Sequence, residues 1–149
     1  MNSRCTMRRR FLLFCCIFGA GFYAHPQAGG AKGVVVEIHN VKPSGGTVHI
    51  SVSLSEASYK NRSPDLLFEV SPADTVIRRE IPLPMGECAI SVYQDTNQNG
   101  KMDTGLFGIP KEPVGISNWN GSGPPGGFRK QSVTINAETA AVRIDLHQL

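Results

Sequence analysis

The chain has few residues suited to disulfide, metal or nucleophilic chemistry. It contains four cysteines in 149 residues, and Cys5, Cys15 and Cys16 all lie near the N-terminus. If that segment is removed, Cys88 is alone and no disulfide can form within the remaining chain. The four histidines show no metal-ligand spacing, and no Gly-x-Ser-x-Gly or Ser/His/Asp pattern occurs. The commonest zinc and serine-hydrolase signatures are therefore missing, and the domain must rely on its hydrophobic core.

The N-terminus carries the features of a targeting segment. Arg4 and residues 8–10 form a basic start, and the apolar run at 11–22 has the length of a secretion signal but is too short to span a bilayer. We expect residues 1–24 to be a signal peptide, with cleavage after Ala24 or as late as Ala28. The protein is then secreted or periplasmic and meets the membrane only through this segment. The alternative is an uncleaved N-terminal membrane anchor.

Positive charge is scarce in the rest of the chain. Residues 1–24 hold four arginines and no acid, which leaves 11 of the 15 basic residues against 12 acidic ones and a formal charge of −1. No basic cluster larger than Arg78-Arg79 or Arg129-Lys130 remains. Nucleic-acid binding is not expected, because it depends on concentrated positive charge.

The hydrophobic pattern beyond residue 33 has a period of two, which predicts half-buried strands. Turn residues separate the apolar stretches, and no amphipathic helix of convincing length is present. The first two strands are predicted to form a hairpin around a turn at 42–46. We expect one all-β domain over residues 33–149, an antiparallel β-sandwich of about seven strands, Ig-like or transthyretin-like. The expected strands are 33–39, 48–54, 66–70, 76–83, 88–94, 132–135 and 141–146.

Residues 95–103 place oxygen-bearing side chains at alternate positions around Gly100, in the pattern D-x-[DN]-x-[DN]-G of a calcium loop. Calcium takes six to eight oxygen ligands, and such a loop points alternate residues inward. We predict a Ca²⁺ site. Its ligands would be the side chains of Asp95, Asn97, Asn99 and Asp103 and the carbonyl of Lys101.

This prediction has a competing interpretation. The twelfth position is Leu106, where an EF-hand needs a bidentate Glu, so the site is expected to be weak and structural unless Glu112 joins it. The affinity would then be about 10⁻⁴–10⁻³ M. Alternatively, the same residues form an ion-free turn in which the Asx side chains bind neighbouring backbone amides.

A long Gly/Pro-rich segment at 105–127 follows the acidic loop. Segments of this length without regular structure are uncommon in compact domains and are usually functional or disordered. Its apolar residues favour an ordered loop that packs over one end of the sandwich. Phe107, Trp119 and Phe128 are candidate contacts for a protein or carbohydrate partner. The alternative is that the single tryptophan only covers the core.

The chain resembles a bacterial family known as domain of unknown function 2141. The resemblance covers about residues 34–146 and is strongest at two strings, D-x-N-x-N-G-K-x-D at 95–103 and G-I-P-K-E-P at 108–113. Gln94 and Ile116 depart from the family pattern, in which a histidine and an aromatic residue are usual. The resemblance implies an exported β-sandwich with this loop, and it implies no particular activity.

Two function classes remain. The preferred hypothesis is an exported, non-catalytic accessory or binding module. The alternative is a small periplasmic hydrolase that pairs Glu112 with Asp95 or Asp103 as acid and base. Against this alternative, Lys111 and Glu112 are expected to be solvated charges on a proline-stiffened loop, and no catalytic residue is assigned.

Overall fold

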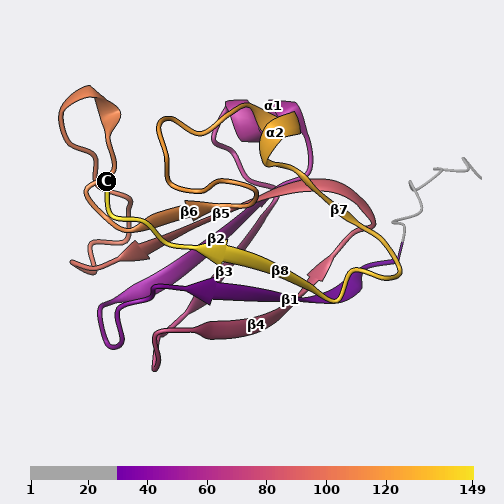
Figure 1. Ribbon diagram of the computed structural model, residues 1–149, viewed down its shortest axis with the longest axis horizontal. Helices are drawn as coiled ribbons and strands as arrows, with labels where there is room; N and C mark the ends of the chain where they lie inside the picture. The colour runs from indigo at the N-terminus through magenta and orange to yellow at the C-terminus, as the bar shows by residue number, and fades with distance from the viewer. Residues whose placement is uncertain (1–29) are drawn as a thin grey trace, which may run out of the picture.

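The computed structural model describes residues 30–149, which form eight strands in two sheets and confirm the predicted all-β sandwich (Figure 1). One sheet has the order β4-β1-β8, and the other has the order β3-β2-β5-β6, with β7 also paired to β5. The predicted signal peptide lies outside the described residues. Within residues 30–149, no helix is long and apolar enough to cross a membrane. The strands are β1 Lys32–His39, β2 Thr47–Ser53, β3 Leu66–Val70, β4 Ile77–Leu83, β5 Gly86–Asp95, β6 Val114–Ile116, β7 Val133–Ile135 and β8 Ala141–Asp145.

The alternating apolar residues of the strands meet between the two sheets. In β1 and β2 every second side chain is fully buried, as the period of two predicts. Fully burying a valine or isoleucine side chain stabilises the fold by about 1.5–3 kcal/mol, so these two strands contribute a large part of the cohesion. The strand residues at the centre of this core are Val34, Val36, Ile38, Val48, Ile50, Val52, Ile81, Leu83, Ile90, Val92, Ile135 and Ile144.

The predicted hairpin between the first two strands is wrong. β1 pairs with β4 and β8, whereas β2 pairs with β3 and β5, so the connection passes from one sheet to the other. The buried side chain of Gln94 holds this connection: its Oε1 accepts from the Lys42 N–H at 2.9 Å, and its Nε2 donates to the Lys42 carbonyl at 2.7 Å. A period-two pattern fixes which side chains are buried but not which neighbour a strand takes.

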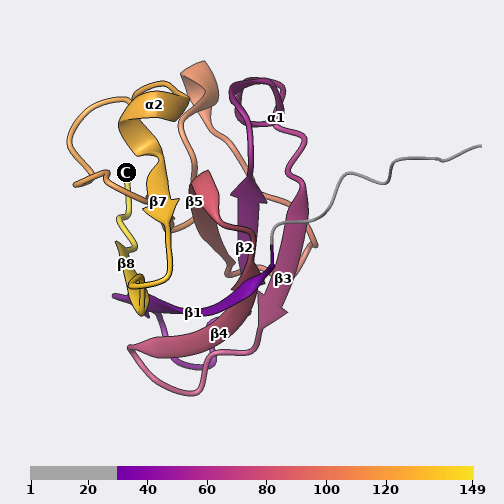
Figure 2. The same cartoon turned by 90° about the vertical axis from the view of Figure 1, so that its right-hand side faces the viewer.

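Three further features differ from the expectation. β1 and β8 are parallel, so the smaller sheet is mixed rather than purely antiparallel. The short strand β6 lies within the Gly/Pro-rich segment and pairs with β5. Two short helices, α1 (Glu56–Lys60) and α2 (Phe128–Gln131), lie beside each other at the same side of the molecule (Figure 2). The Tyr59 and Phe128 rings contact edge to face there, with centroids 6.2 Å apart.

Candidate functional site

The acidic loop starts where β5 ends, and Asp95 is the residue that shapes it. Asp95 is 2 % exposed, and its carboxylate accepts hydrogen bonds from the backbone N–H of Asn99 at 3.2 Å and of Gly100 at 2.7 Å. Gly100 has φ 77°, a left-handed conformation that glycine adopts without a steric cost. Burial opposes ionisation of Asp95, but these backbone N–H groups outweigh it and hold the pKa of the carboxyl below its usual value.

Three of the other predicted ligands converge on one point. The Nδ2 atoms of Asn97 and Asn99 donate to the same oxygen, Oδ2 of Asp103, at 2.6 Å and 2.8 Å. The Oδ1 atoms of the two asparagines accept backbone N–H groups from Asn99 and Lys101, at 3.2 Å and 3.0 Å. The loop is therefore a run of Asx turns that gathers amide and carboxylate groups at its centre.

The donor set fits calcium in type but not as arranged, because the amide nitrogens of Asn97 and Asn99, not their oxygens, face Asp103. The gathered groups are a carboxylate and two side-chain amides, whose oxygens are the hard ligands that calcium prefers. Asp95, Asn97, Asn99 and Asp103 would hold the ion, together with the Lys101 carbonyl, and the ion would neutralise charge and fix the loop. Among residues 30–149, no group of three or more His, Cys, Asp or Glu side chains is placed to hold a metal, so amide and backbone oxygens would have to complete the set.

Glu112 is the residue whose place differs most from the sequence-based expectation. It was expected to be a solvated charge, but it is 2 % exposed and reaches into the acidic loop. Its Oε1 accepts from the Thr96 N–H at 3.0 Å, and its Oε2 accepts from the Asp103 N–H at 3.2 Å. One carboxylate therefore ties together the start and the end of the loop. The Lys111 N–H, which donates to the Asp103 carbonyl at 2.9 Å, brings Glu112 into position.

The burial of Glu112 bears on the proposed acid–base pairing with Asp95 or Asp103. Both oxygens of Glu112 accept backbone N–H groups, and both oxygens of Asp95 do the same. These contacts give each carboxylate a role in holding the loop backbone. No local sequence pattern indicates this role, because Glu112 contacts backbone amides 16 and 9 residues away in the chain.

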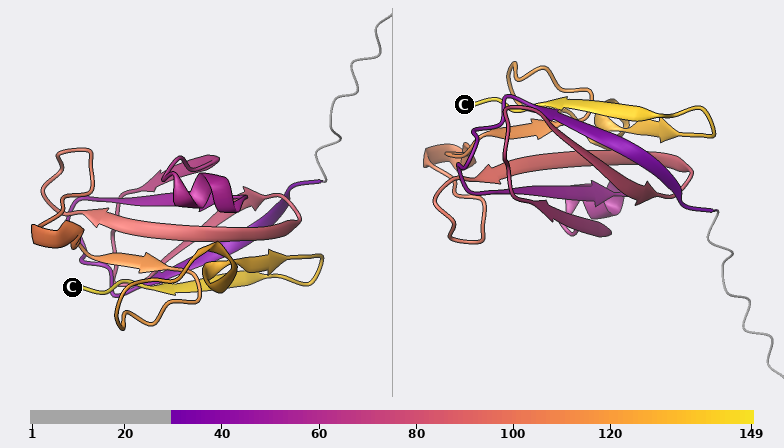
Figure 3. Two further views of the ribbon diagram at one scale, coloured as in Figure 1. Left: turned by 90° about the horizontal axis from the view of Figure 1, so that it is seen from above. Right: turned by 90° about the horizontal axis from the view of Figure 1, so that it is seen from below.

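The three candidate partner contacts lie in different environments. Phe107 is 97 % exposed and follows Leu106, which is 83 % exposed. Both belong to the short turn Leu106–Gly108, in a segment that projects from one end of the sandwich (Figure 3). Phe107 also has φ 62°, a strained conformation for a large side chain. Trp119 is half-buried and packs edge to face on His147, with ring centroids 5.5 Å apart. Phe128 is 7 % exposed and belongs to the packing between α1 and α2.

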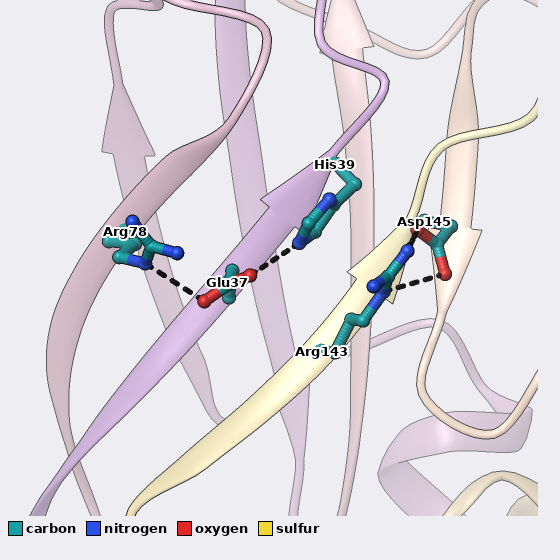
Figure 4. Close-up of polar contacts among 5 residues, drawn as sticks. All are labelled: Glu37, His39, Arg78, Arg143 and Asp145. Atoms are coloured by element: carbon teal, nitrogen blue, oxygen red, sulfur yellow. Dashed lines mark hydrogen bonds and ion pairs between the residues drawn. The ribbon is translucent and has the colours of Figure 1, made fainter.

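A second group of polar side chains lies on the outer face of the sheet β4-β1-β8 (Figure 4). Glu37 contacts Arg78 at 2.9 Å and His39 at 2.5 Å, and Arg143 contacts Asp145 at 2.8 Å. The Arg78 and His39 hydrogen bonds lower the pKa of Glu37. The Arg143 hydrogen bond lowers the pKa of Asp145. The Glu37–Arg78 contact joins β1 to β4, and the other two contacts each lie along one strand of this exposed sheet face.

Comparison with known proteins gives one match. The model of a family described as "Uncharacterized protein conserved in bacteria (DUF2141)" matches residues 36–143, which is more than half of the chain and includes the acidic loop and Glu112. No curated protein and no solved structure matches the chain.

Proposed function

The chain belongs to this bacterial family, and we propose that it is an exported, non-catalytic binding or accessory module with a structural calcium ion in the Asp95–Asp103 loop. The observation that carries the calcium proposal is that the Asn97, Asn99 and Asp103 side chains meet at one point. A bound ion would replace the two Nδ2–H contacts to Asp103 and take the amide oxygens instead. The carboxylates of Asp95, Asp103 and Glu112 all border this loop at the end of β5, and their negative charge would favour a divalent cation.

The non-catalytic part of the proposal is supported by how the acids are used. Asp95 and Glu112 are both engaged by backbone N–H groups of the loop, an arrangement that orders a loop rather than transfers protons. Neither carboxylate is left free to approach a substrate. The loop ends at the bridge between Thr104 and Pro110, so an ion would stabilise the base of the projecting segment.

Calcium-dependent stability tests this proposal. At about 10 mM Ca²⁺ and a dissociation constant of about 10⁻⁴–10⁻³ M, binding to the folded state adds about 1.4–2.7 kcal/mol. Thermal unfolding with calcium and with chelator should therefore differ by roughly 5–10 °C. Magnesium should give a smaller effect, because it demands near-ideal octahedral geometry and dehydrates reluctantly.

The informative variant is Asp103→Asn, because Asp95 holds backbone N–H groups whether or not an ion is present. Asp103→Asn keeps the size of the side chain and removes one of the two predicted carboxylate ligands, so the calcium response should fall sharply. Asp74→Asn is the matched control, since Asp74 lies in the exposed β3–β4 turn and should leave the response unchanged. Equal melting temperatures with calcium and chelator would rule out the ion and leave an Asx-rich turn.

Export is tested separately. Mass spectrometry of the protein from its native cell should find an N-terminus near His25 or Gly29, because the basic start and the apolar run at 11–22 predict cleavage there. An intact Met1 in the soluble cytoplasmic fraction would contradict export.

A further inference from the structure

A groove lies on the outer face of the sheet β3-β2-β5-β6. It encloses about 500 Å³, within the range of small-molecule sites. Ser51 on β2 and Ser91 on β5 lie on its floor, and they are direct partners in the strand register. The segment around α1 forms one wall, and the Gly/Pro-rich segment forms the other. The Tyr59 hydroxyl donates to the Gly126 carbonyl at 3.3 Å, so the two walls are tied together at this end.

Aromatic rings line this groove from three different elements. Tyr59 comes from α1, Tyr93 from β5 and Trp119 from the segment after β6. Tyr93 is held by a parallel stack on His49, with centroids 4.6 Å apart and an interplanar angle of 8°. Within residues 30–149, Trp119 Nε1 is one of three buried side-chain nitrogens without a hydrogen-bond partner. Because this nitrogen is closed to solvent, Trp119 offers the groove its ring surface rather than its N–H.

The charged side chains along the groove have one sign, and the backbone carboxylate of Leu149 lies beside Pro110, away from them. Lys60 and Arg62 line the groove, and no Asp or Glu side chain does. Arg62 has φ 54°, a left-handed conformation that is uncommon outside glycine and clusters at functional sites. Lys60 ends α1 and Arg62 follows it closely, so both cations are at the α1 end of the groove. Ser53 pairs with Ala89 near this end, and Tyr93 lies at the other end, two residues beyond Ser91 along β5.

We propose that this groove binds an acidic carbohydrate, with sugar rings against Tyr93 and Trp119 and a carboxylate near Lys60 and Arg62. The face of an aromatic ring carries negative charge and attracts the C–H groups of a sugar ring. The Ser51 and Ser91 hydroxyls can donate to and accept from sugar hydroxyls. A guanidinium fork matches the geometry of a carboxylate, which gives Arg62 a preference for uronic acids over neutral sugars.

This inference deepens the proposed binding role and does not depend on calcium. The acidic loop lies beyond Tyr93, at the opposite end of the groove from Lys60 and Arg62. An anionic ligand would therefore place its carboxylate at the α1 end, away from Asp95 and Glu112. The ligand thus has one favoured direction along the groove.

Trp119 is the only tryptophan in the chain, so its fluorescence reports directly on the groove. We would titrate the protein with trigalacturonic acid and, separately, with its fully methyl-esterified form, which keeps the rings and removes the charge. The acid should give a saturable change below about 10 mM, and the ester should bind at least about fivefold more weakly. A signal that does not change with the acid, or an equal response to acid and ester, would overturn the proposal.

Two variant pairs assign the charge preference to this groove. The double variant Lys60→Gln/Arg62→Gln should bind the acid about fivefold or more weakly than the wild type does, with an affinity close to that for the ester. Arg78→Gln with Arg79→Gln removes the same charge from β4, on the other sheet, and should leave binding unchanged. Equal losses in both pairs would mean nonspecific attraction and would overturn the site.

The same samples separate this inference from the proposed function. The thermal shift with calcium is measured alongside each titration, so absent sugar binding with an intact calcium response overturns the groove alone. Chromatography of the sugar after incubation checks for shortened products. Cleavage of a sugar that binds in the groove would uphold the site and overturn the non-catalytic assignment.

Discussion

Replacing Glu112 is the sharpest test of how the acidic loop is held. Its two oxygens accept the backbone N–H groups of Thr96 and Asp103, at 3.0 Å and 3.2 Å, and so join the two ends of the loop. Glu112→Ala removes both acceptors and leaves two backbone donors to be satisfied by water or by nothing. Glu112→Gln keeps one acceptor oxygen and sets an NH₂ group against the other donor.

The magnitude follows from these contacts. A hydrogen bond to a charged group contributes about 1.5–3 kcal/mol net, and water reaching the exposed loop recovers part of the loss. We therefore expect Glu112→Ala to lower the free energy of unfolding by about 2–4 kcal/mol, and Glu112→Gln by about 1–2 kcal/mol. In a domain of this size the alanine variant should melt about 10 °C lower. The total stability of such domains is about 5–15 kcal/mol, so both variants should still fold.

Urea denaturation of the wild type, both variants and Glu87→Ala measures these differences. Glu87 is exposed at the start of β5, and its replacement should change stability by no more than about 0.5 kcal/mol. Amide hydrogen exchange should show faster exchange at Thr96 and Asp103 in the Glu112 variants. If Glu112→Ala is as stable as the wild type, the Glu112 carboxylate does not hold the loop. The same conclusion follows if Glu87→Ala lowers the free energy of unfolding as much as Glu112→Ala does.

Three further predictions concern the scaffold. Gly46→Ala should lower the free energy of unfolding by at least about 1–2 kcal/mol, because Gly46 has φ 91° and an added Cβ would meet the Asp95 carbonyl. Chemical denaturation measures the difference, and an unchanged midpoint would refute the prediction. Burial raises the pKa of Cys88 to about 11. In a variant whose other three cysteines are replaced by serine, the Cys88 thiol should therefore react with a disulfide reagent at pH 8 only after unfolding. Rapid labelling of the folded protein would contradict this prediction. Arg143 lowers the pKa of Asp145 from 3.8, so this pair stabilises the fold above about pH 3.8 and the gain is lost as pH falls through the lowered pKa. Arg143→Gln should therefore be less stable than the wild type at pH 7, and the deficit should shrink as pH falls below about 3.8; a deficit that does not change with pH would refute the pairing.

Much of the fold was predictable because it depends on local alternation. All seven strands predicted from the period of two are present, and the residues expected to face inward at Val34, Val36 and Ile50 are buried. β6 was not predicted, because three residues between glycines and prolines are too few to show a period. Its pairing with β5 depends on a partner distant in sequence, which local patterns do not encode.

The candidate site was predictable only in part. The spacing of Asp95, Asn97, Asn99 and Asp103 around Gly100 was enough to indicate a loop with inward-facing oxygens, because turn residues act on their immediate neighbours. The burial of Glu112 was not predictable, since it depends on how the Lys111 N–H meets the Asp103 carbonyl across the loop. That Phe107 is exposed while Phe128 is buried could not be predicted either, because an apolar side chain is buried only where another surface reaches it.

The sequence by itself therefore determined the strands, the inward-facing residues and the Asx turns, all of which follow from alternation or from contacts within a few residues. Only the tertiary structure decided that β1 and β2 separate into different sheets, that β1 runs parallel to β8, and that Tyr59, Tyr93 and Trp119 line one groove. These features arise from pairings between segments far apart in the chain. Their free energy comes from packing two sheets around one core, and alternation within a single strand carries no information about which partner that packing selects.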